Sequence, residues 1–263
     1  MRLTPAQLRQ FNEDGVLILP NLFSDAEVEV LRAAMNRVLT QDNPANIREK
    51  KSEVVRTAMG LHVRDEVFAR LSRHPRFVEP ARQITGQNLY IQQSKINVKE
   101  AFTGEVWQWH QDFPTHHRDD GVPRPEALNL HVLLDDVNEF NGPLYFIRGS
   151  HRFGPAASIY DTTTTSHPLW VIDPGVVRQM TDKGDLISAK GKAGTALIFG
   201  ECVAHCSPPN LSPWTRAIFS LILNPVANRF TNPKRPEYIH HRDLTPVTPL
   251  HDGCLLDELE PVA

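Results

Sequence analysis

The chain of 263 residues has few cysteines, no excess of basic residues and no long apolar segment. Its three cysteines, Cys202, Cys206 and Cys254, cannot all pair, so they form no disulfide framework and we expect a protein of the reducing cytoplasm. Lys and Arg number 28 against 31 Asp and Glu, a net charge of −3, which argues against a nucleic-acid partner. No apolar run approaches the roughly 20 residues of a membrane-spanning helix, so we expect no membrane partner.

The remaining composition is that of an ordinary folded protein, with 40% hydrophobic and 22% charged residues. Glycine is modest at 14 residues, whereas proline is abundant at 21. Many prolines favour turns, sheet edges and ordered loops over long helices. The chain is long enough to bury a large core, and no Gly/Ser linker divides it, so we expect one domain over residues 1–263.

Residues 1–88 predict a mainly helical layer. Thr4 with Gln7 and Ser24 with Glu27 have the spacing of capping boxes, and each begins a helix. Gln41 to Ser52 is polar and is expected to be a loop and a candidate lid. The elements expected in this half are helices near residues 4–14, 24–35, 66–71 and 76–84 and a short strand at 16–19.

Residues 89–263 predict a β-rich half. Its apolar runs are short, and Gly, Pro or Asn borders them, as in the turn signal Asn141-Gly142. Antiparallel strands at this spacing favour a barrel or a jelly roll. The strands expected are at residues 89–98, 127–134, 143–147, 195–199 and 217–223.

One pattern predicts a metal site. His110 and Asp112 lie two residues apart in a segment interpreted as a strand, so both side chains are expected on one face. A second histidine from a distant strand would complete a set of two histidines and one carboxylate, which suits Fe(II) and leaves coordination positions open. His205, after the apolar run at residues 195–199, is the candidate. Its alternative interpretation is a turn histidine at a strand end.

Arg216 is the candidate anchor for a second ligand. It begins the apolar run at residues 217–223, where an arginine is usually a solvated edge charge. An arginine directed into a barrel would need a carboxylate partner, because an unpaired buried charge costs several kcal/mol. A dicarboxylate cosubstrate would supply that partner in bidentate form.

Several ordered motifs resemble those of the phytanoyl-CoA dioxygenase superfamily of Fe(II)/2-oxoglutarate-dependent oxygenases. The chain is most similar to the ectoine hydroxylases and to bacterial hydroxylases of free amino acids such as leucine. The resemblance covers nearly the whole chain, and the segments that carry it are at residues 10–15, 90–97, 109–113, 120–124, 140–144, 149–152 and 236–243.

The resemblance implies a double-stranded β-helix, a cupin-like jelly roll with helices outside. It implies that His110, Asp112 and His205 bind Fe(II) and that Arg216 binds the distal carboxylate of 2-oxoglutarate. The implied reaction consumes O2, releases succinate and CO2, and hydroxylates an unactivated C–H bond; ascorbate is expected to support activity. The presence of Asp112 favours hydroxylation, because related halogenases lack this carboxylate.

Further residues are expected around the cosubstrate and the substrate. By resemblance, Gln93 and Asn97 line this pocket, as does Ser207; the alternative for the first two is cross-strand hydrogen bonding. Arg242 is a candidate for the substrate carboxylate, with an exposed charge pair as its alternative. Thr115 and Phe113 are candidate pocket residues.

Two pairs of adjacent histidines, His116-His117 and His240-His241, are interpreted as solvated loop residues, with a second metal site as the alternative at the first pair. Three further functions remain open. The same chemistry could desaturate or cyclise, or could act on a natural-product scaffold or a carrier-bound residue. A non-catalytic jelly-roll binding protein would lack a ligand, and a zinc hydrolase would not require Arg216. The leading hypothesis is hydroxylation of a small free amino acid or derivative by a monomer or homodimer.

Overall fold

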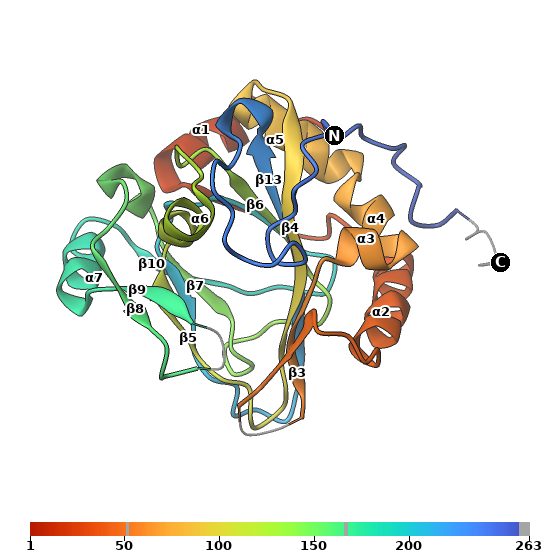
Figure 1. The fold of residues 1–263 in the computed structure, drawn as a ribbon, viewed down its shortest axis with the longest axis horizontal. Helices are drawn as coiled ribbons and strands as arrows, with labels where there is room; N and C mark the ends of the chain where they lie inside the picture. The colour runs from red at the N-terminus through yellow and green to blue at the C-terminus, as the bar shows by residue number, and fades with distance from the viewer. Residues whose placement is uncertain (51–52, 166–167, 258–263) are drawn as a thin grey trace.

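The computed structural model describes residues 1–50, 53–165 and 168–257. Two antiparallel sheets face one another, and helices cover the outer side of the larger sheet (Figure 1). This is the jelly-roll arrangement that the sequence predicts. The polar cavity described below lies between the two sheets.

The larger sheet has seven strands in the order β1-β11-β6-β13-β4-β3-β2. Its two long central strands, β13 and β4, pair along their whole length, and every residue of β13 is buried. A strand that is buried on both faces of its sheet is typically rich in Ile, Leu, Val and Phe. The strands are β1 (Val16–Leu19), β2 (Asn46–Arg48), β3 (Val55–Met59), β4 (Leu89–Lys99), β6 (Leu128–Leu133), β11 (Ala196–Gly200) and β13 (Arg216–Pro225).

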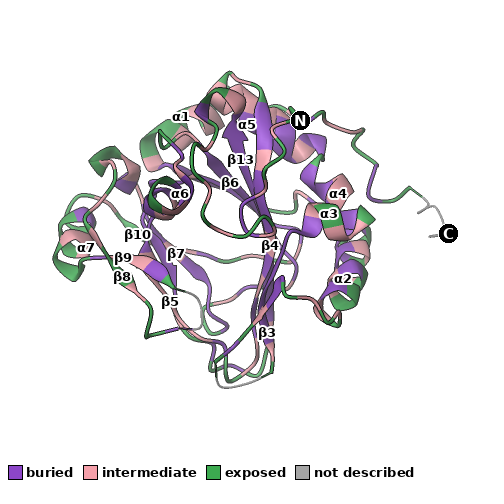
Figure 2. Cartoon of the chain, in the orientation of Figure 1, coloured by how far each residue is buried: buried purple, intermediate pink, exposed green. Residues whose placement is uncertain are grey.

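The smaller sheet has six strands in the order β10-β7-β12-β5-β9-β8. None is longer than four residues, and β8 and β10 carry exposed positions at the edges (Figure 2). Sequence reasoning found only β7 and the segment of β5 among them, because such short strands have too few residues to show alternation. The strands are β5 (Trp107–His110), β7 (Leu144–Ile147), β8 (Ser158–Asp161), β9 (Leu169–Ile172), β10 (Leu186–Ala189) and β12 (His205–Ser207).

The four helices that the sequence predicts, α1, α2, α4 and α5, begin within a residue of the expected positions, whereas α3, α6 and α7 were not predicted. Thr4 and Ser24 each form a complete capping box, and Gly15 and Gly86 end their helices in the left-handed conformation. The helices are α1 (Pro5–Asp14), α2 (Asp25–Leu39), α3 (Leu61–Arg64), α4 (Glu66–Ser72), α5 (Pro75–Thr85), α6 (Asp112–Asp120) and α7 (Pro174–Thr181), with short 3₁₀ turns η1 (Ser150–Phe153) and η2 (Val226–Asn228).

The main hydrophobic core lies between the larger sheet and the helices α2, α4 and α5. Phe68 of α4 stacks on Phe219 of β13 with ring centroids 5.4 Å apart, and both side chains are fully buried. Smaller clusters lie between the sheets and beside the smaller sheet. The larger sheet is therefore the rigid platform on which the cavity is built.

Three predictions about local structure need correction. The segment 41–52 is not only a loop, because β2 lies in it and pairs with β3; residues 51–52 lie outside the described residues. Besides the expected strand β1, the N-terminal layer supplies two unexpected strands of the larger sheet, β2 and β3. Asp112 does not continue the strand of His110, because it is the first residue of α6. All three cysteines are free and buried.

Among the described residues, no helix has the length and apolar character needed to cross a membrane.

Candidate active site

A cavity opens between the sheets, and polar side chains of both sheets line it. The larger sheet contributes from β4, β6 and β13, and the smaller sheet from β5 and β12. The residues that carry its chemistry are Gln93, Lys95, Asn97, His110, Asp112, Thr115, His116, Asn129, His131, His205, Ser207, Arg216, Ser220 and Arg235.

His110, Asp112 and His205 converge at one wall of this cavity. Their potential ligand atoms all lie within 4.8 Å of one another, and this is the one such group of three among the described residues. Nε2 of His110 is 3.9 Å from Oδ1 of Asp112, and Nε2 of His205 is 3.8 Å from Oδ2. The histidines face each other across the pairing of β5 with β12. The structure therefore brings together the three side chains that the sequence predicts.

Hydrogen bonds hold both histidines in the tautomer that metal binding needs. Nδ1 of His110 lies 2.6 Å from the carbonyl of Gln108, and Nδ1 of His205 lies 2.9 Å from that of Val203. A carbonyl only accepts, so each Nδ1 carries the proton and each Nε2 offers its lone pair to the centre. Burial and the neighbouring His205 lower the pKa of His110 to about 3, which keeps it neutral.

Asp112 is fixed by the helix that it begins. Its backbone N–H donates to the carbonyl of Glu201, and its Oδ2 accepts a 2.9 Å hydrogen bond from Asn129. Burial opposes its ionisation, but His205, His110 and Lys95 together hold its pKa well below the ordinary value. The site therefore offers an anionic oxygen beside the Nε2 atoms of the two histidines. This donor set fits a divalent cation such as Fe(II).

Arg216 lies at the inner end of the cavity with its side chain 1% exposed. Nε and Nη2 both donate to the carbonyl of Gly142, at 3.1 and 2.8 Å, and Nη2 is 3.5 Å from Oγ of Ser207. Among the described residues no carboxylate contacts the guanidinium; burial lowers its pKa to about 9, and Asp135 opposes this effect. The charge of Asp135 acts on Arg216 without contacting it. A buried guanidinium with no carboxylate in contact fits a carboxylate ligand such as the distal end of 2-oxoglutarate.

Gly142 makes this arrangement possible. Its φ is +76°, and a Cβ there would lie 2.7 Å from Cδ of Lys99. The Asn141-Gly142 turn predicted from the sequence thus brings a backbone carbonyl against Arg216.

Gln93, Asn97, Ser207 and Thr115 all line the cavity as expected. Asn97 also makes the cross-strand hydrogen bond of the alternative interpretation, whereas Gln93 bonds to a C-terminal segment outside the sheets. Gln93 donates to the carbonyl of Ile239 at 2.8 Å, and Asn97 accepts from Thr57 at 3.0 Å. These contacts orient the two amides without removing them from the cavity wall.

Two expected substrate residues lie elsewhere. The side chain of Arg242 is exposed, and its Nη2 reaches only the carbonyl of Arg235, at 3.4 Å. Phe113 is buried against His117 and does not line the cavity. The structure does not bring either residue to the other candidates.

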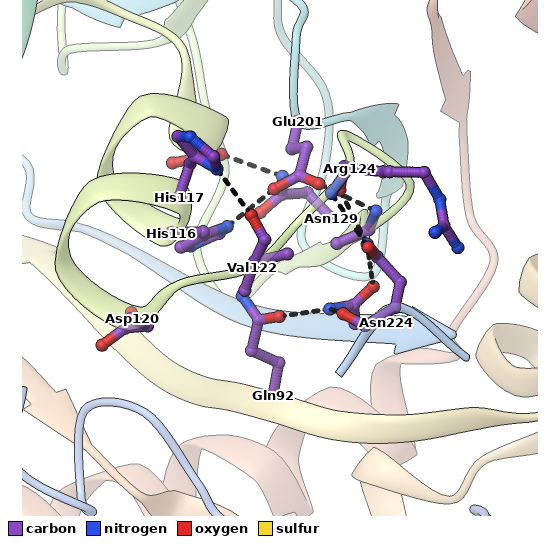
Figure 3. Close-up of polar contacts among 12 residues, drawn as sticks. Gln92, His116, His117, Asp120, Val122, Arg124, Asn129, Glu201 and Asn224 are labelled. Atoms are coloured by element: carbon purple, nitrogen blue, oxygen red, sulfur yellow. Dashed lines mark hydrogen bonds and ion pairs between the residues drawn. The ribbon is translucent and has the colours of Figure 1, made fainter. Parts of the chain in front are cut away.

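The interpretation of the two histidine pairs as solvated was wrong for His116 and for His240, which are both buried. His116 is 2% exposed, lines the cavity and lies with Nδ1 2.7 Å from Oε2 of Glu201 (Figure 3). His240 is fully buried, with Nδ1 2.9 Å from Asp120. On the helix α6, consecutive residues point about 100° apart, so the neighbour His117 is exposed while His116 is buried.

Sequence reasoning missed several cavity residues, although a signal for some was present. Gln93, Lys95 and Asn97 alternate along β4, so a lysine between two expected pocket residues had to face the same way. Asn129 and His131 alternate in the same manner on β6. No local signal marks Arg235, because its position depends on an ion pair with Asp120 across the chain.

The phytanoyl-CoA dioxygenase (PhyH) family model matches residues 11–218. The chain belongs to the phytanoyl-CoA dioxygenase family. It is 37% identical to the ectoine dioxygenase of Bordetella bronchiseptica over 91% of this chain and 83% of that protein. It is 35% identical to the L-proline trans-4-hydroxylase of Streptomyces griseoviridis, over 94% and 96%.

Solved structures agree with this assignment. EctD from S. alaskensis with 2-oxoglutarate and 5-hydroxyectoine is similar with a TM-score of 0.84 and 30% identity, covering 95% of this chain and 87% of that one. The same protein with bound Fe gives a TM-score of 0.83. The family and fold predicted from the sequence are confirmed. The chain is a non-haem Fe(II)- and 2-oxoglutarate-dependent dioxygenase.

Proposed function

We propose that this enzyme hydroxylates an unactivated C–H bond of a small free amino acid or amino-acid derivative. In this proposal His110, Asp112 and His205 hold Fe(II), and Arg216 with Ser207 binds the distal carboxylate of 2-oxoglutarate. The observation that carries it is the convergence of the three ligand atoms in the same cavity as a buried, unpaired guanidinium. When bound, iron with 2-oxoglutarate and O2 supplies the oxidising power and yields succinate and CO2.

The protein's own residues hold the metal ligands in position and line the cavity around the bound molecules. Asn129 and the N-terminus of α6 hold Asp112 in place, and the carbonyls of Gln108 and Val203 hold the histidine rings. Gln93 and Asn97 line the same cavity as Arg216. His110, His205 and Arg216 are buried, which strengthens the electrostatic contacts at the reacting groups.

The charges of the cavity favour a substrate that carries a carboxylate. Lys95 lines the cavity and makes no hydrogen bond or ion pair with any described residue. Burial lowers its pKa, and Asp112 opposes this effect. With Fe(II) bound by Asp112, and with 2-oxoglutarate bound by iron and Arg216, Lys95 is the remaining unpaired cation. A second carboxylate balances it.

Arg235 replaces Arg242 as the second candidate for this carboxylate. It lines the cavity, and Asp120 holds its guanidinium through Nε at 2.8 Å. The relatives named ectoine dioxygenase and L-proline trans-4-hydroxylase act, by their names, on small cyclic molecules of this kind. A compact amino acid with one carboxylate fits both the charge and the enclosure.

The proposal also covers the domain organisation, the cellular location and the oligomeric state. We expect one domain over residues 1–263, because β1 pairs with β11 and β3 with β4, which joins the two halves in one sheet. We expect a cytoplasmic enzyme, acting as a monomer or homodimer without nucleic-acid or membrane partners. The three free cysteines support a reducing compartment.

The test is a panel of ectoine, L-proline and other free amino acids incubated with enzyme, Fe(II), 2-oxoglutarate and ascorbate. Mass spectrometry reads the gain of one oxygen, and succinate is quantified in parallel. The proposal predicts one oxygen gained per succinate with at least one panel member. Succinate release that no panel member stimulates would overturn the substrate class.

A further inference from the structure

His116 and Glu201 form a buried pair in the cavity wall that the proposed chemistry does not use. His116 lies one helical turn after Asp112 on α6, and Glu201 directly follows β11. Their side chains are 3% and 0% exposed, and Nδ1 of the ring is 2.7 Å from Oε2 of the carboxylate (Figure 3). A buried ionisable pair at a ligand cavity is a candidate for recognition of the ligand.

The contacts of Glu201 determine which nitrogen of His116 carries the proton. Oε1 accepts a 3.0 Å hydrogen bond from the backbone N–H of Ala127, and Oε2 faces the ring. No Lys or Arg among the described residues pairs with this carboxylate. The amides of Asp112 and Phe113 both donate to its backbone carbonyl, which fixes it against the start of α6. Burial raises the pKa of Glu201, and the hydrogen bonds with His116 and the Ala127 N–H oppose this effect. As a carboxylate, Glu201 accepts from Nδ1–H of the ring.

The other ring nitrogen is left for a ligand. Nε2 of His116 has no hydrogen-bond partner in the part of the chain that the structure describes, and it is not among the atoms sealed from solvent without a partner. The residue lines the cavity, so its small accessible part faces that space. With Nδ1 donating to Glu201, Nε2 carries a lone pair toward the cavity.

We propose that Nε2 of His116 accepts a hydrogen bond from the amine nitrogen of the substrate, and that Glu201 fixes the ring in the tautomer that does so. This inference rests on the proposed function and deepens it, since Lys95 would bind the carboxylate of the same amino acid. The cationic nitrogen of the substrate would lie where a second ring proton would otherwise be. Its positive charge would then balance the negative charge of Glu201 across the imidazole ring. His116 thus selects amino acids over analogues that lack the N–H donor.

Binding without turnover provides the readout. Dissociation constants are measured by calorimetry in the absence of oxygen, on enzyme loaded with Fe(II) and 2-oxoglutarate. The probes are two matched pairs, L-proline with tetrahydrofuran-2-carboxylate and L-leucine with 4-methylpentanoate. The second member of each pair keeps the carboxylate and loses the N–H donor. We expect the wild-type enzyme to bind at least one amino acid roughly tenfold to a hundredfold more tightly than its analogue.

Four variants test the assignment. His116→Phe removes the acceptor, and the preference falls to about unity. Glu201→Gln keeps an oxygen that accepts from the N–H of Ala127, but its amide N–H donates to Nδ1 of His116. The ring proton then lies on Nε2, which becomes a donor. The preference is therefore lost although the histidine remains. His116→Gln keeps an acceptor oxygen and retains part of the preference. His117→Phe, at the exposed neighbouring position, leaves it unchanged.

The outcomes separate this inference from the proposed function. Wild-type preference that survives in both His116→Phe and Glu201→Gln overturns the role of His116 and leaves the substrate class standing. Wild-type enzyme that neither binds nor oxygenates any amino acid overturns both. If His116→Phe fails to fold by circular dichroism, Glu201→Gln and His116→Gln decide, because both keep the buried pair hydrogen-bonded.

Discussion

The two sheets of this enzyme differ in how they are held and in what they carry. The larger sheet has strands of up to 11 residues and packs its outer face on the helices. The smaller sheet has strands of four residues or fewer, and its edge strands are partly exposed. Yet the smaller sheet carries both histidines of the metal site, whereas the larger sheet carries Arg216, Gln93 and Asn97. Stability and metal chemistry are therefore placed on different layers.

Side-chain hydrogen bonds compensate for the short strands beside the metal site. Gln111 lies between His110 and Asp112 and is fully buried. Its amide donates to the carbonyls of Cys202 and Gly154, at 2.7 and 3.0 Å, and its oxygen accepts from Ala156. One side chain thus ties the segment before α6 to two loops. Such cross-links fix a site that strand pairing alone would leave loose.

The largest expected effect comes from removing a metal ligand on the smaller sheet. His205→Ala should cost more than the roughly 10- to 100-fold in metal affinity that loss of an outer partner costs. Because the larger sheet is untouched, the fold should persist by circular dichroism. Iron content and succinate release check this, with the exposed His251→Ala as control. Wild-type iron content in His205→Ala would contradict the assignment.

Matched cavities in the two layers test where stability lies. Leu221→Ala on β13 and Ile172→Ala on β9 remove the same number of carbon atoms from buried side chains. Leu221 belongs to the large core cluster, and Ile172 to a cluster of four buried residues. We expect a loss near the top of the range of about 2–5 kcal/mol for Leu221→Ala and near the bottom for Ile172→Ala. Urea denaturation measures both, and equal losses would remove the distinction.

Arg216→Gln tests the anchor on the larger sheet. Losing a charged hydrogen-bonding partner costs about 1.5–3 kcal/mol, so the KM for 2-oxoglutarate should rise roughly tenfold to a hundredfold. Iron binding should stay as in the wild type, because the ligands lie on the other layer. The exposed Arg124→Gln serves as control. An unchanged KM would mean that the cosubstrate binds elsewhere.

Lowering the pH is expected to have a smaller effect, a loss of folding stability in the metal-free protein. Burial, with Arg76 nearby, lowers the pKa of His74 from 6.5 to about 4, and burial lowers that of His110 to about 3. The unfolded chain therefore binds protons first as the pH falls below 6.5, and the stability of the metal-free protein declines from there toward the folded pKa values. Each buried histidine contributes up to about 1.4 kcal/mol per pH unit.

His74→Asn sharpens this expectation, because asparagine can still cap α5 but does not titrate. Urea midpoints of the metal-free protein at pH 7, 6 and 5 should fall less steeply in the variant than in the wild type. Identical slopes would show that His74 is not the source.

Much of the larger sheet and its helices could be predicted from the sequence, because capping boxes and long apolar strands are local signals. The strands β8, β9, β10 and β12 could not, since runs of three or four residues give no period. Asp112 was expected on a strand, and its helix shows that a correct residue pair can rest on an incorrect element.

At the site, too, some features could be predicted from the sequence and others could not. His110, Asp112, His205 and Arg216 could be predicted from motifs, but the orientation of partners could not. The sequence suggested Arg242 and gave no sign of Arg235, because sequence alone does not reveal that Asp120 holds Arg235 at the cavity wall. His116 was missed because its burial follows from helical geometry that the sequence did not indicate.

The most direct measurement is a crystal structure of the enzyme with Fe(II) and 2-oxoglutarate, grown without oxygen, with anomalous scattering recorded at the iron edge. A single iron peak between Nε2 of His110, the carboxylate of Asp112 and Nε2 of His205, with the distal carboxylate of 2-oxoglutarate on Arg216, is the predicted result. An iron peak elsewhere, or a cosubstrate carboxylate away from Arg216, would contradict the division of the site between the two sheets.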